Sequence, residues 1–282
     1  MLKKNKNYRY GEKLSYNVSA QVRYYSEIKK LIDDMATKTQ KKVLALFRAP
    51  VAQKFKNQQA EAAAMDAGVS DDAKKLIGKL QKEFKALFTT KAPIFAVRMI
   101  AQADKSSSVA LTRSIKKLVD AVTVKMYFIP KGLKQITKSI LAENVSLITT
   151  IPEEYFKNIT GVVMRSITTG MGMDELTRHL HKYYGTATNK ARNVASDQSR
   201  KAYNAINKQR MMAAGYKEFE WLHSGGGLHP RKDHIAMDGK IYSFDKLPVI
   251  DKETGERGIP GQAINCKCTM RPVYRLENEG KI

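Results

Sequence analysis

The sequence contains little cysteine, few acidic residues for its basic content and no long apolar run. Its two cysteines, Cys266 and Cys268, are too few and too close together for the disulfide framework that small secreted domains use. No stretch reaches the roughly 18 to 20 apolar residues that span a bilayer. The first residues, MLKKNKNYRYGEK, lack the apolar core of a secretory signal. We therefore expect no membrane span and a protein that is made and kept inside a cell.

Basic residues dominate the charge, because 50 Lys and Arg stand against 27 Asp and Glu and give a formal net charge of +23. A surface with this excess collects phosphate oxygens and releases condensed counterions, so it binds nucleic acid with little sequence preference and strong salt dependence. The sequence thus predicts double-stranded DNA as a non-specific partner. A basic surface that only keeps the protein soluble, and one that meets an anionic membrane, stay open as alternatives.

A change of period along the chain indicates an α+β fold. From Ser19 to about Ala214, apolar residues recur at the three- and four-residue spacing of amphipathic helices, and beyond Gly215 the period approaches that of strands. We expect a mostly helical N-terminal region followed by a long helix and a small C-terminal β-containing module. The expected parts are a basic extended arm that could contact a neighbour (1–17), a helical region (18–185), the module with its leading helix (186–276) and a tail (277–282).

Glycine and proline set the expected helix boundaries. Glycine readily takes the left-handed conformation that ends many helices, and proline favours the first turn of a helix. Separate helices are therefore predicted to end at Gly68, Gly170 and Gly185, and to begin near Pro93 and Pro152. The first helix is expected to stop before Pro50, and the segment from Val122 to Phe128 favours a strand.

The longest expected helix runs from Thr188 to Ala214 and has two different faces. One face is a stripe of mostly small residues, which lets a neighbouring backbone approach closely. The other face is basic and is the part of the chain best suited to contact DNA phosphates: Lys190, Arg192, Arg200, Lys201, Lys208 and Arg210. His179 and His181 precede this helix and share no helical face, so we expect ordinary surface or packing histidines.

The stretch from Trp221 to Tyr274 holds most of the distinctive residues. Strands are expected at 217–222, 240–244 and 267–274, with Asp238-Gly239 as a hairpin turn. The structural motif expected in this module consists of Trp221, Arg231, His234, Asp238, Gly239, Pro260, Gly261, Asn265, Cys266 and Cys268.

Two interpretations of the cysteines remain open. Thiols two residues apart on a strand point to one face, and with His229 or His234 they supply the ligand types that zinc selects. In the other interpretation the protein has no cofactor, Cys266 and Cys268 are small buried hydrophobic side chains, and His234 is held by hydrogen bonds.

A nuclease is a further alternative. Its general base would be His234, and Asp238 or Asn265 would hold a divalent metal. The sequence lacks a second carboxylate or histidine at a characteristic spacing from these residues.

Several motifs in the second half of the chain resemble a known family. They are ENVSLITTIPEEYFKNITGVVMRSITTGMGMDEL (143–176), ARNVASDQSRKAYN (191–204), Trp221, RKDHIAMDG (231–239), Pro260-Gly261 and NCKCT (265–269). In this order they resemble the phage Mu F-like minor head proteins, also described as phage head morphogenesis proteins. The resemblance covers residues 140–275 well and the earlier helices only in general character.

The resemblance implies a structural protein of the virion and not an enzyme. Members of this family associate with the portal and act in head assembly and in DNA packaging or delivery. The implied partners are the portal protein, capsid or scaffold proteins and double-stranded DNA. The implied location is the phage head, and the host cytoplasm during assembly.

The chain departs from some relatives at Arg231-Lys-Asp-His234, where they carry a Cys-x-x-Cys pair. A full set of the metal ligands of those relatives would therefore be incomplete here. We expect Arg231 or His234 to hydrogen-bond to the turn at Asn265 instead, and Arg231, His234, Asp238, Asn265, Cys266 and Cys268 to converge in space.

The fold of the family module has been compared with that of ADP-ribosyltransferases, which makes an enzyme or toxin-like module an alternative. Glu218-x-Glu220 superficially resembles their catalytic Glu-x-Glu. However, those enzymes place the pair last along the chain, after a Ser-Thr-Ser strand, whereas here it comes first and no Ser-Thr-Ser follows. We therefore interpret Glu218 and Glu220 as the polar edge of a strand.

Overall fold

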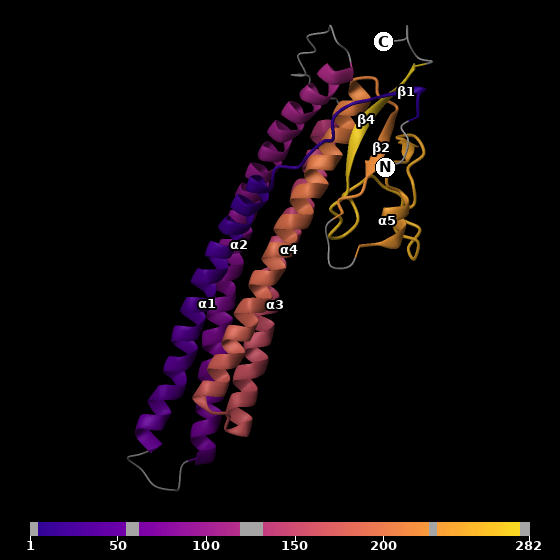
Figure 1. Cartoon of the computed structure of the whole chain (residues 1–282). Helices are drawn as coiled ribbons and strands as arrows, with labels where there is room; N and C mark the ends of the chain where they lie inside the picture. The colour runs from indigo at the N-terminus through magenta and orange to yellow at the C-terminus, as the bar shows by residue number, and fades with distance from the viewer. Residues whose placement is uncertain (1–4, 55–61, 119–131, 226–229, 277–282) are drawn as a thin grey trace. The chain divides into compact units, whose positions relative to one another are not determined.

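The computed structural model describes residues 5–54, 62–118, 132–225 and 230–276, and it confirms the α+β class (Figure 1). Within these residues there are five helices and four strands. In chain order they are β1 (Tyr8–Tyr10), α1 (Val18–Lys54), α2 (Ala62–Leu118), α3 (Leu133–Thr169), α4 (Met173–Ala213), β2 (Glu218–Leu222), α5 (Lys232–Ala236), β3 (Ile241–Ser243) and β4 (Thr269–Arg275).

The chain forms two compact units that do not follow chain order. Unit 1 contains residues 1–22, 97–142 and 195–282, and unit 2 contains residues 23–96 and 143–194. Each of the four long helices contributes one portion to each unit.

Unit 2 is a bundle of helix segments from α1, α2, α3 and α4. Its core consists of apolar residues spaced three or four apart, as the sequence predicts. They are Ile28, Ile32 and Met35 of α1; Ile77, Leu80, Phe84 and Phe88 of α2; and Ile151, Tyr155, Phe156 and Ile159 of α3. Phe84 and Phe156 stack with ring centroids 6.2 Å apart, and the Tyr24 hydroxyl donates to Asn144 at 2.7 Å. Burial of these apolar residues therefore determines which face of each helix points into the core.

Several predicted helix boundaries are wrong, because the helices run through them. α1 passes Pro50, α2 passes Gly68 and Pro93, α3 passes Pro152, and α4 passes Gly185. An interior proline removes one helical hydrogen bond and costs about 3 kcal/mol, and a glycine costs about 1 kcal/mol. The buried neighbours Ala92, Phe95 and Ala96 show how packing offsets that cost around Pro93.

Two boundaries set by glycine are confirmed. α3 ends at Thr169 and is followed by Gly170 with φ of 66°. α4 ends at Ala213, just before Gly215 with φ of 84°. Positive φ is the conformation for which glycine is favoured, and here the chain does leave the helix.

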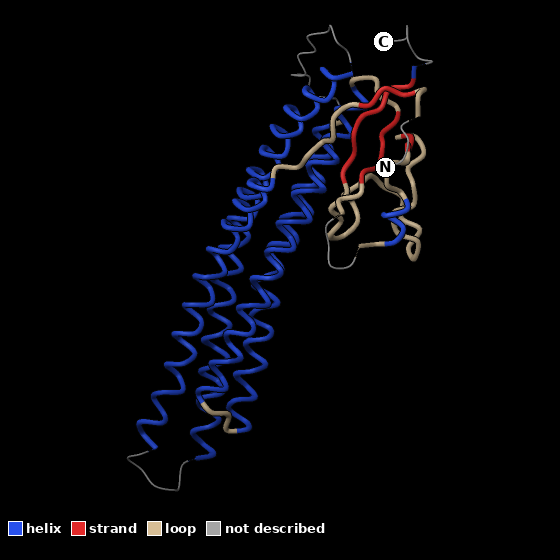
Figure 2. Tube along the Cα trace, viewed as in Figure 1, coloured by secondary structure: helices blue, strands red, loops and turns tan. Residues whose placement is uncertain are grey.

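The four strands of unit 1 form one antiparallel sheet in the order β1-β4-β2-β3 (Figure 2). The three predicted strands of the module are confirmed as β2, β3 and β4, with Trp221 opposite Met270 and Phe219 opposite Tyr242. Trp221 and Phe219 are fully buried and supply the core of the sheet.

Part of the segment expected to be an arm is the fourth strand. β1 pairs with β4, so that Tyr8 lies opposite Arg275 and Tyr10 opposite Val273. The chain continues along β4, since the N–H groups of Gly11 and Leu14 donate to the carbonyls of Pro272 and Met270, each at 3.0 Å. This extended segment pairs with its own chain, and a contact with a neighbour is not needed to order it.

Other expectations fall outside the described residues. They concern the strand at 122–128, His229 and the tail at 277–282. Among the described helices, each is too short or too polar to cross a bilayer.

Candidate functional site

A cluster of three side chains stands out in the C-terminal module of unit 1. The His234 Nδ1 atom lies 3.4 Å from Cys266 Sγ and 3.8 Å from Cys268 Sγ, and the three ligand atoms lie within 4.8 Å of one another. All three residues are buried, and both cysteines are free thiols. The chain thus brings together one imidazole and two sulfur atoms from positions 32 and 34 residues apart.

Each member of the cluster is held by its local structure. His234 lies in α5, a five-residue helix that follows Arg231. Cys266 follows a turn in which its N–H donates to the carbonyl of Ala263 at 2.9 Å, and Cys268 lies just before β4. The predicted arrangement of both cysteines on one strand is therefore replaced by a turn that aims both thiols at the imidazole.

The second ring nitrogen of His234 fixes the orientation of the imidazole. Nε2 lies 2.9 Å from the carbonyl oxygen of Ile250, and because a carbonyl only accepts, Nε2 carries the hydrogen. The Trp221 ring packs edge-on against the imidazole, with centroids 5.2 Å apart. His234 is thus a hub between α5, β2 and the long segment that connects β3 with β4.

Hydrogen bonding within the cluster shifts its proton affinities. The thiol of Cys268 donates to Cys266 and lowers the pKa of Cys266, while the same bond and burial raise the pKa of Cys268. The hydrogen bond with Cys266 raises the pKa of His234. Cys266 is therefore the more acidic of the two thiols.

Arg231 and Asp238 are exposed and supply none of the three buried ligand atoms of the cluster. Arg231 is exposed and precedes α5 without a side-chain cap. Asp238 is also exposed, and its Oδ1 accepts the backbone N–H of His223 at 2.7 Å. A turn does form at Asp238-Gly239, with Gly239 at φ of 73° and its N–H bound to the carbonyl of Trp221 at 2.9 Å, but it follows α5 and is not the predicted hairpin turn, since β2 ends at Leu222 and β3 begins at Ile241.

Asn265 has a different partner from the one expected. Its N–H donates to Asp197 Oδ1 at 2.8 Å, so neither Arg231 nor His234 holds this backbone group. Asn265 adopts φ of 58°, a left-handed conformation that asparagine tolerates better than most residues. Asp197, which also pairs with Lys201 at 3.0 Å, was missed, although the run of polar residues at 196–201, beside a stripe of small residues in α4, could have signalled it.

Gly261 fits against α4 for a steric reason. It has φ of 80°, and a Cβ placed there would lie 2.2 Å from Nδ2 of Asn204. Pro260 and Gly261 are both buried. The Pro-Gly pair is thus a packing element that lets the connecting segment lie on the long helix.

Glu218 and Glu220 take part in a polar ladder across the sheet. Glu220 is buried and pairs with Arg271, which lies directly opposite it on β4. Glu218 accepts from Arg275 at 3.2 Å. The Arg271 and Arg275 guanidinium groups in turn lie over the rings of Tyr10 and Tyr8. Both carboxylates therefore help to hold strands together, and Glu220 is buried on a strand that lies between β4 and β3 and not at the polar edge expected for it.

The six basic residues proposed for DNA contact differ widely in exposure. Arg192 is exposed, whereas Lys190, Arg200, Lys201 and Lys208 are half-buried. Arg210 is buried and pairs with Asp104 at 2.8 Å. Lys190 pairs with Glu154, and Arg200 lies over the ring of Tyr16. Most of these cations therefore have a structural role within their own unit.

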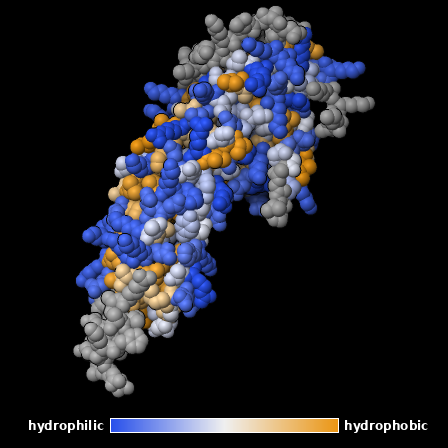
Figure 3. Space-filling view, turned by 60° about the vertical axis from the view of Figure 1, so that its left-hand side comes forward, coloured by the Kyte–Doolittle hydropathy of each residue, from blue (hydrophilic) through white to orange (hydrophobic). Residues whose placement is uncertain are grey.

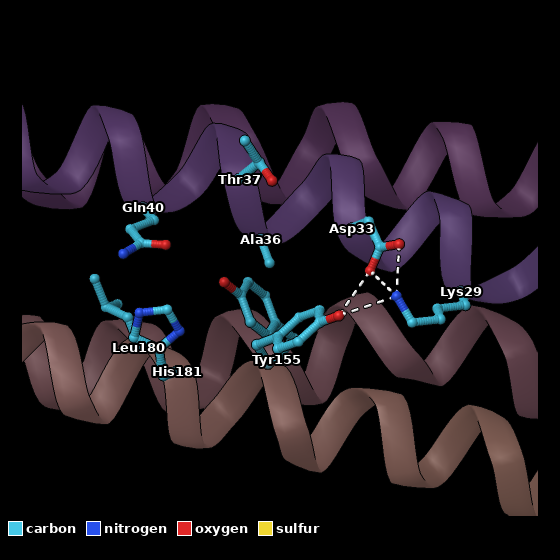
Figure 4. A pocket seen from close by; sticks show the side chains of 9 residues that line it. Lys29, Asp33, Ala36, Thr37, Gln40, Tyr155, Leu180 and His181 are labelled. Carbon is cyan, nitrogen blue, oxygen red and sulfur yellow. Dashed lines mark hydrogen bonds and ion pairs between the residues drawn. The ribbon is translucent and has the colours of Figure 1, made fainter.

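A hollow of about 270 Å³ lies on the surface of unit 2 (Figure 4). Lys29 Nζ, Asp33 and the Tyr184 hydroxyl form a closed network at one side of it, with distances of 2.7 to 3.1 Å. The hydrogen bond to Asp33 raises the pKa of Lys29. His181 lines the hollow and is exposed, as predicted. Because the charged groups already satisfy one another, the hollow offers no uncompensated charge to a ligand.

Comparison with known proteins agrees with the resemblance found in the sequence. Residues 157–271 match the family model described as phage Mu protein F like protein, which supports the assignment of the chain to that family. The matched residues include the last third of α3, all of α4, and the described module up to the first residues of β4.

One curated relative extends beyond this family segment. The chain is 24% identical over 210 residues to an uncharacterized protein of Haemophilus influenzae, and the alignment covers 74% of this chain and 45% of that protein. The chain thus matches less than half the length of this relative. No solved structure matches the chain.

Proposed function

We propose, from the phage Mu F-like assignment of residues 157–271, that this chain is a minor head protein that acts in phage head morphogenesis. In this role it is a component of the virion, and it resides in the host cytoplasm while heads assemble. Its partners are the portal protein, capsid or scaffold proteins and packaged double-stranded DNA. The family match is the observation that carries the proposal.

The DNA part of the proposal is supported by the basic surface. The formal charge of +23 requires anionic counterparts, and the face shown in Figure 3 is predominantly hydrophilic. A packaged genome presents about one phosphate charge per 1.7 Å of duplex. A protein enclosed with it gains counterion-release free energy from every exposed cation that reaches a phosphate.

The exposed side of α2 in unit 2 suits this contact better than α4 does. It carries six exposed lysines: Lys74, Lys75, Lys79, Lys82, Lys85 and Lys91. Lys74 and Lys85 form ion pairs with Asp71 and Glu153. Among the described residues, no ion pair engages Lys75, Lys79 or Lys82, which follow one another at four- and three-residue spacing along one helix face.

The dimensions of this lysine row agree with several phosphate contacts. Seven residues of helix span about 10 Å, and a duplex presents about six phosphate charges over that length. We therefore propose Lys75, Lys79 and Lys82 as DNA contacts and retain Arg192 as an additional one. Arg210 is not retained, because binding a phosphate would break its pair with Asp104.

DNA binding is tested by titrating a fluorescent duplex of random sequence with the full chain at several salt concentrations. We expect affinity to fall steeply with salt. The Lys75→Gln/Lys79→Gln/Lys82→Gln variant should weaken binding and reduce the slope of log K against log salt by up to about 3, since each phosphate contact contributes about 0.9.

The matched control is Lys217→Gln/Lys240→Gln/Lys267→Gln, which removes the same charge from exposed positions of the module. If both triple variants lost equal affinity, net charge alone and not the α2 row would explain binding. A wild-type affinity that did not change with salt would exclude the phosphate contacts altogether.

The assembly part is tested separately, in heads purified from cells that produce the phage encoding this chain. We expect the chain to sediment with heads and to be present at a fixed ratio to portal subunits by quantitative mass spectrometry. Heads that contain portal but lack the chain at every assembly stage would refute the assignment as a head component, whatever its affinity for DNA.

A further inference from the structure

The three-residue cluster has the dimensions of a tetrahedral metal site. Zinc binds thiolate at about 2.3 Å and imidazole nitrogen at about 2.0 Å, so tetrahedral angles place N and S about 3.5 Å apart. The two separations from His234 Nδ1 are 3.4 and 3.8 Å. Both nitrogen–sulfur separations therefore fit one shared ion to within a few tenths of an ångström, and the two sulfur atoms lie within 4.8 Å of each other.

The imidazole is already oriented as a metal ligand. Its Nε2–H donates to the carbonyl of Ile250 at 2.9 Å, which leaves Nδ1 directed at the two sulfurs. Histidine ligands almost always donate their second N–H to a carboxylate or a carbonyl in this way, because that bond fixes both tautomer and ring orientation. The edge of Trp221 adds an apolar wall beside the imidazole.

The buried surroundings of the cluster favour an ion and ligands that together carry no net charge. All three residues are at most 4% exposed, and burying an unpaired charge there would be costly. A divalent cation with two thiolates and one neutral imidazole carries no net charge. Soft sulfur ligands together with nitrogen select zinc over hard cations such as magnesium or calcium.

We propose that His234 Nδ1, Cys266 Sγ and Cys268 Sγ bind one Zn²⁺ ion, with a water molecule as the fourth ligand. Binding replaces the protons of the two thiols, which pass to solvent, and no oxidant or reductant is required. The three ligands belong to the described residues, so the site does not require His229.

The ion has a structural role in this module. The segment that connects β3 with β4 spans residues 244–268. Among its described residues it has no helix or strand, and its one β-pairing is the isolated bridge between Val249 and Arg257. It is attached to His234 at two points, Ile250 and the Cys266–Cys268 turn. A metal bond at the second point closes this segment onto α5, much as structural zinc does in small domains with limited cores.

The direct test is to purify the full chain under reducing conditions, remove metal with a chelator and titrate it with Co²⁺ and then Zn²⁺. We expect one Co²⁺ per chain, with thiolate-to-cobalt charge-transfer bands and the visible spectrum of a tetrahedral ion, both abolished by one equivalent of Zn²⁺. Zinc should also raise the midpoint of the unfolding transition followed by Trp221 fluorescence.

Variants then identify the ligands. Cys266→Ala, Cys268→Ala and His234→Gln should each lower the metal affinity by at least about tenfold, whereas His181→Gln, an exposed histidine outside the cluster, should leave it unchanged. If a ligand variant does not fold, the wild-type cobalt spectrum still decides the question. Absence of thiolate-to-cobalt bands in the folded wild-type chain, or equal metal loss in His181→Gln, would overturn the proposal.

Discussion

Unit 2 and the C-terminal module of unit 1 are stabilised in different ways. In unit 2 the buried residues recur at every third or fourth position along long helices. Ion pairs of this unit, such as Lys85 with Glu153, lie on its surface. In the module the decisive contacts join residues far apart in sequence, as His234 joins Ile250 and Cys266. Because similar apolar contacts recur along its helices, we expect unit 2 to tolerate single substitutions. The stability of the module, by contrast, should depend on individual side chains.

The largest effect that tests this contrast is expected from Phe219→Ala. Phe219 is fully buried and stacks on Phe244 with centroids 4.9 Å apart, so truncation should destabilise the module by about 3 to 5 kcal/mol. Urea unfolding followed by Trp221 fluorescence measures the change. Ile264→Ala, at a position 67% exposed, is the control and should change the free energy of unfolding by less than about 0.5 kcal/mol. Similar losses in the two variants would show that the sheet core is not closely packed.

Ion pairs in the two regions should differ several-fold in the unfolding free energy that is lost when one partner is removed. Arg271→Ala leaves the buried carboxylate of Glu220 without its partner and should cost about 3 kcal/mol. Lys85→Ala removes one partner of an exposed pair in unit 2 and should cost at most about 0.5 kcal/mol. Denaturant unfolding of both variants checks this, and the Glu220→Gln/Arg271→Ala double variant should recover part of the loss. Equal costs for Arg271→Ala and Lys85→Ala would remove the distinction between the regions.

Glycine substitutions are expected to have smaller effects and opposite signs. Gly261→Ala places a methyl group against Asn204 at a positive φ and should destabilise the protein by about 1 to 3 kcal/mol. Gly185→Ala lies inside α4, where the new Cβ would point into open space, and should stabilise the protein by about 0.5 to 1 kcal/mol. Thermal melts followed by circular dichroism measure both shifts. A loss of stability in Gly185→Ala would mean that this helical position is constrained after all.

The same contrast explains how much of the fold could be predicted. Apolar spacing predicts that helices form and which face is buried, since this information is local, and the strands β2, β3 and β4 follow from their composition. Pro93 and Gly185 misled the boundary predictions because their local cost is smaller than the packing free energy around them. Pairing of β1 with β4 has no local signal at all.

The candidate site was only partly predictable for a related reason. His234, Cys266 and Cys268 could be grouped because their side chains share a chemistry. Arg231 was grouped with them by proximity in sequence, yet it lies on the surface. Asp197 and the carbonyl of Ile250 were missed, since a backbone acceptor has no sequence signature and a helical aspartate is usually solvated.

The position of β1 has a consequence for biosynthesis. Tyr8 and Arg275 are 267 residues apart, and at about 5 to 20 residues per second a ribosome needs roughly 15 to 50 seconds to add the residues between them. During that interval the first strand has no partner, and the edge of β4 that it covers does not yet exist. Closure of the sheet therefore has to wait for synthesis of β4, and a nascent chain released before Arg275 would leave β1 unpaired and open to aggregation.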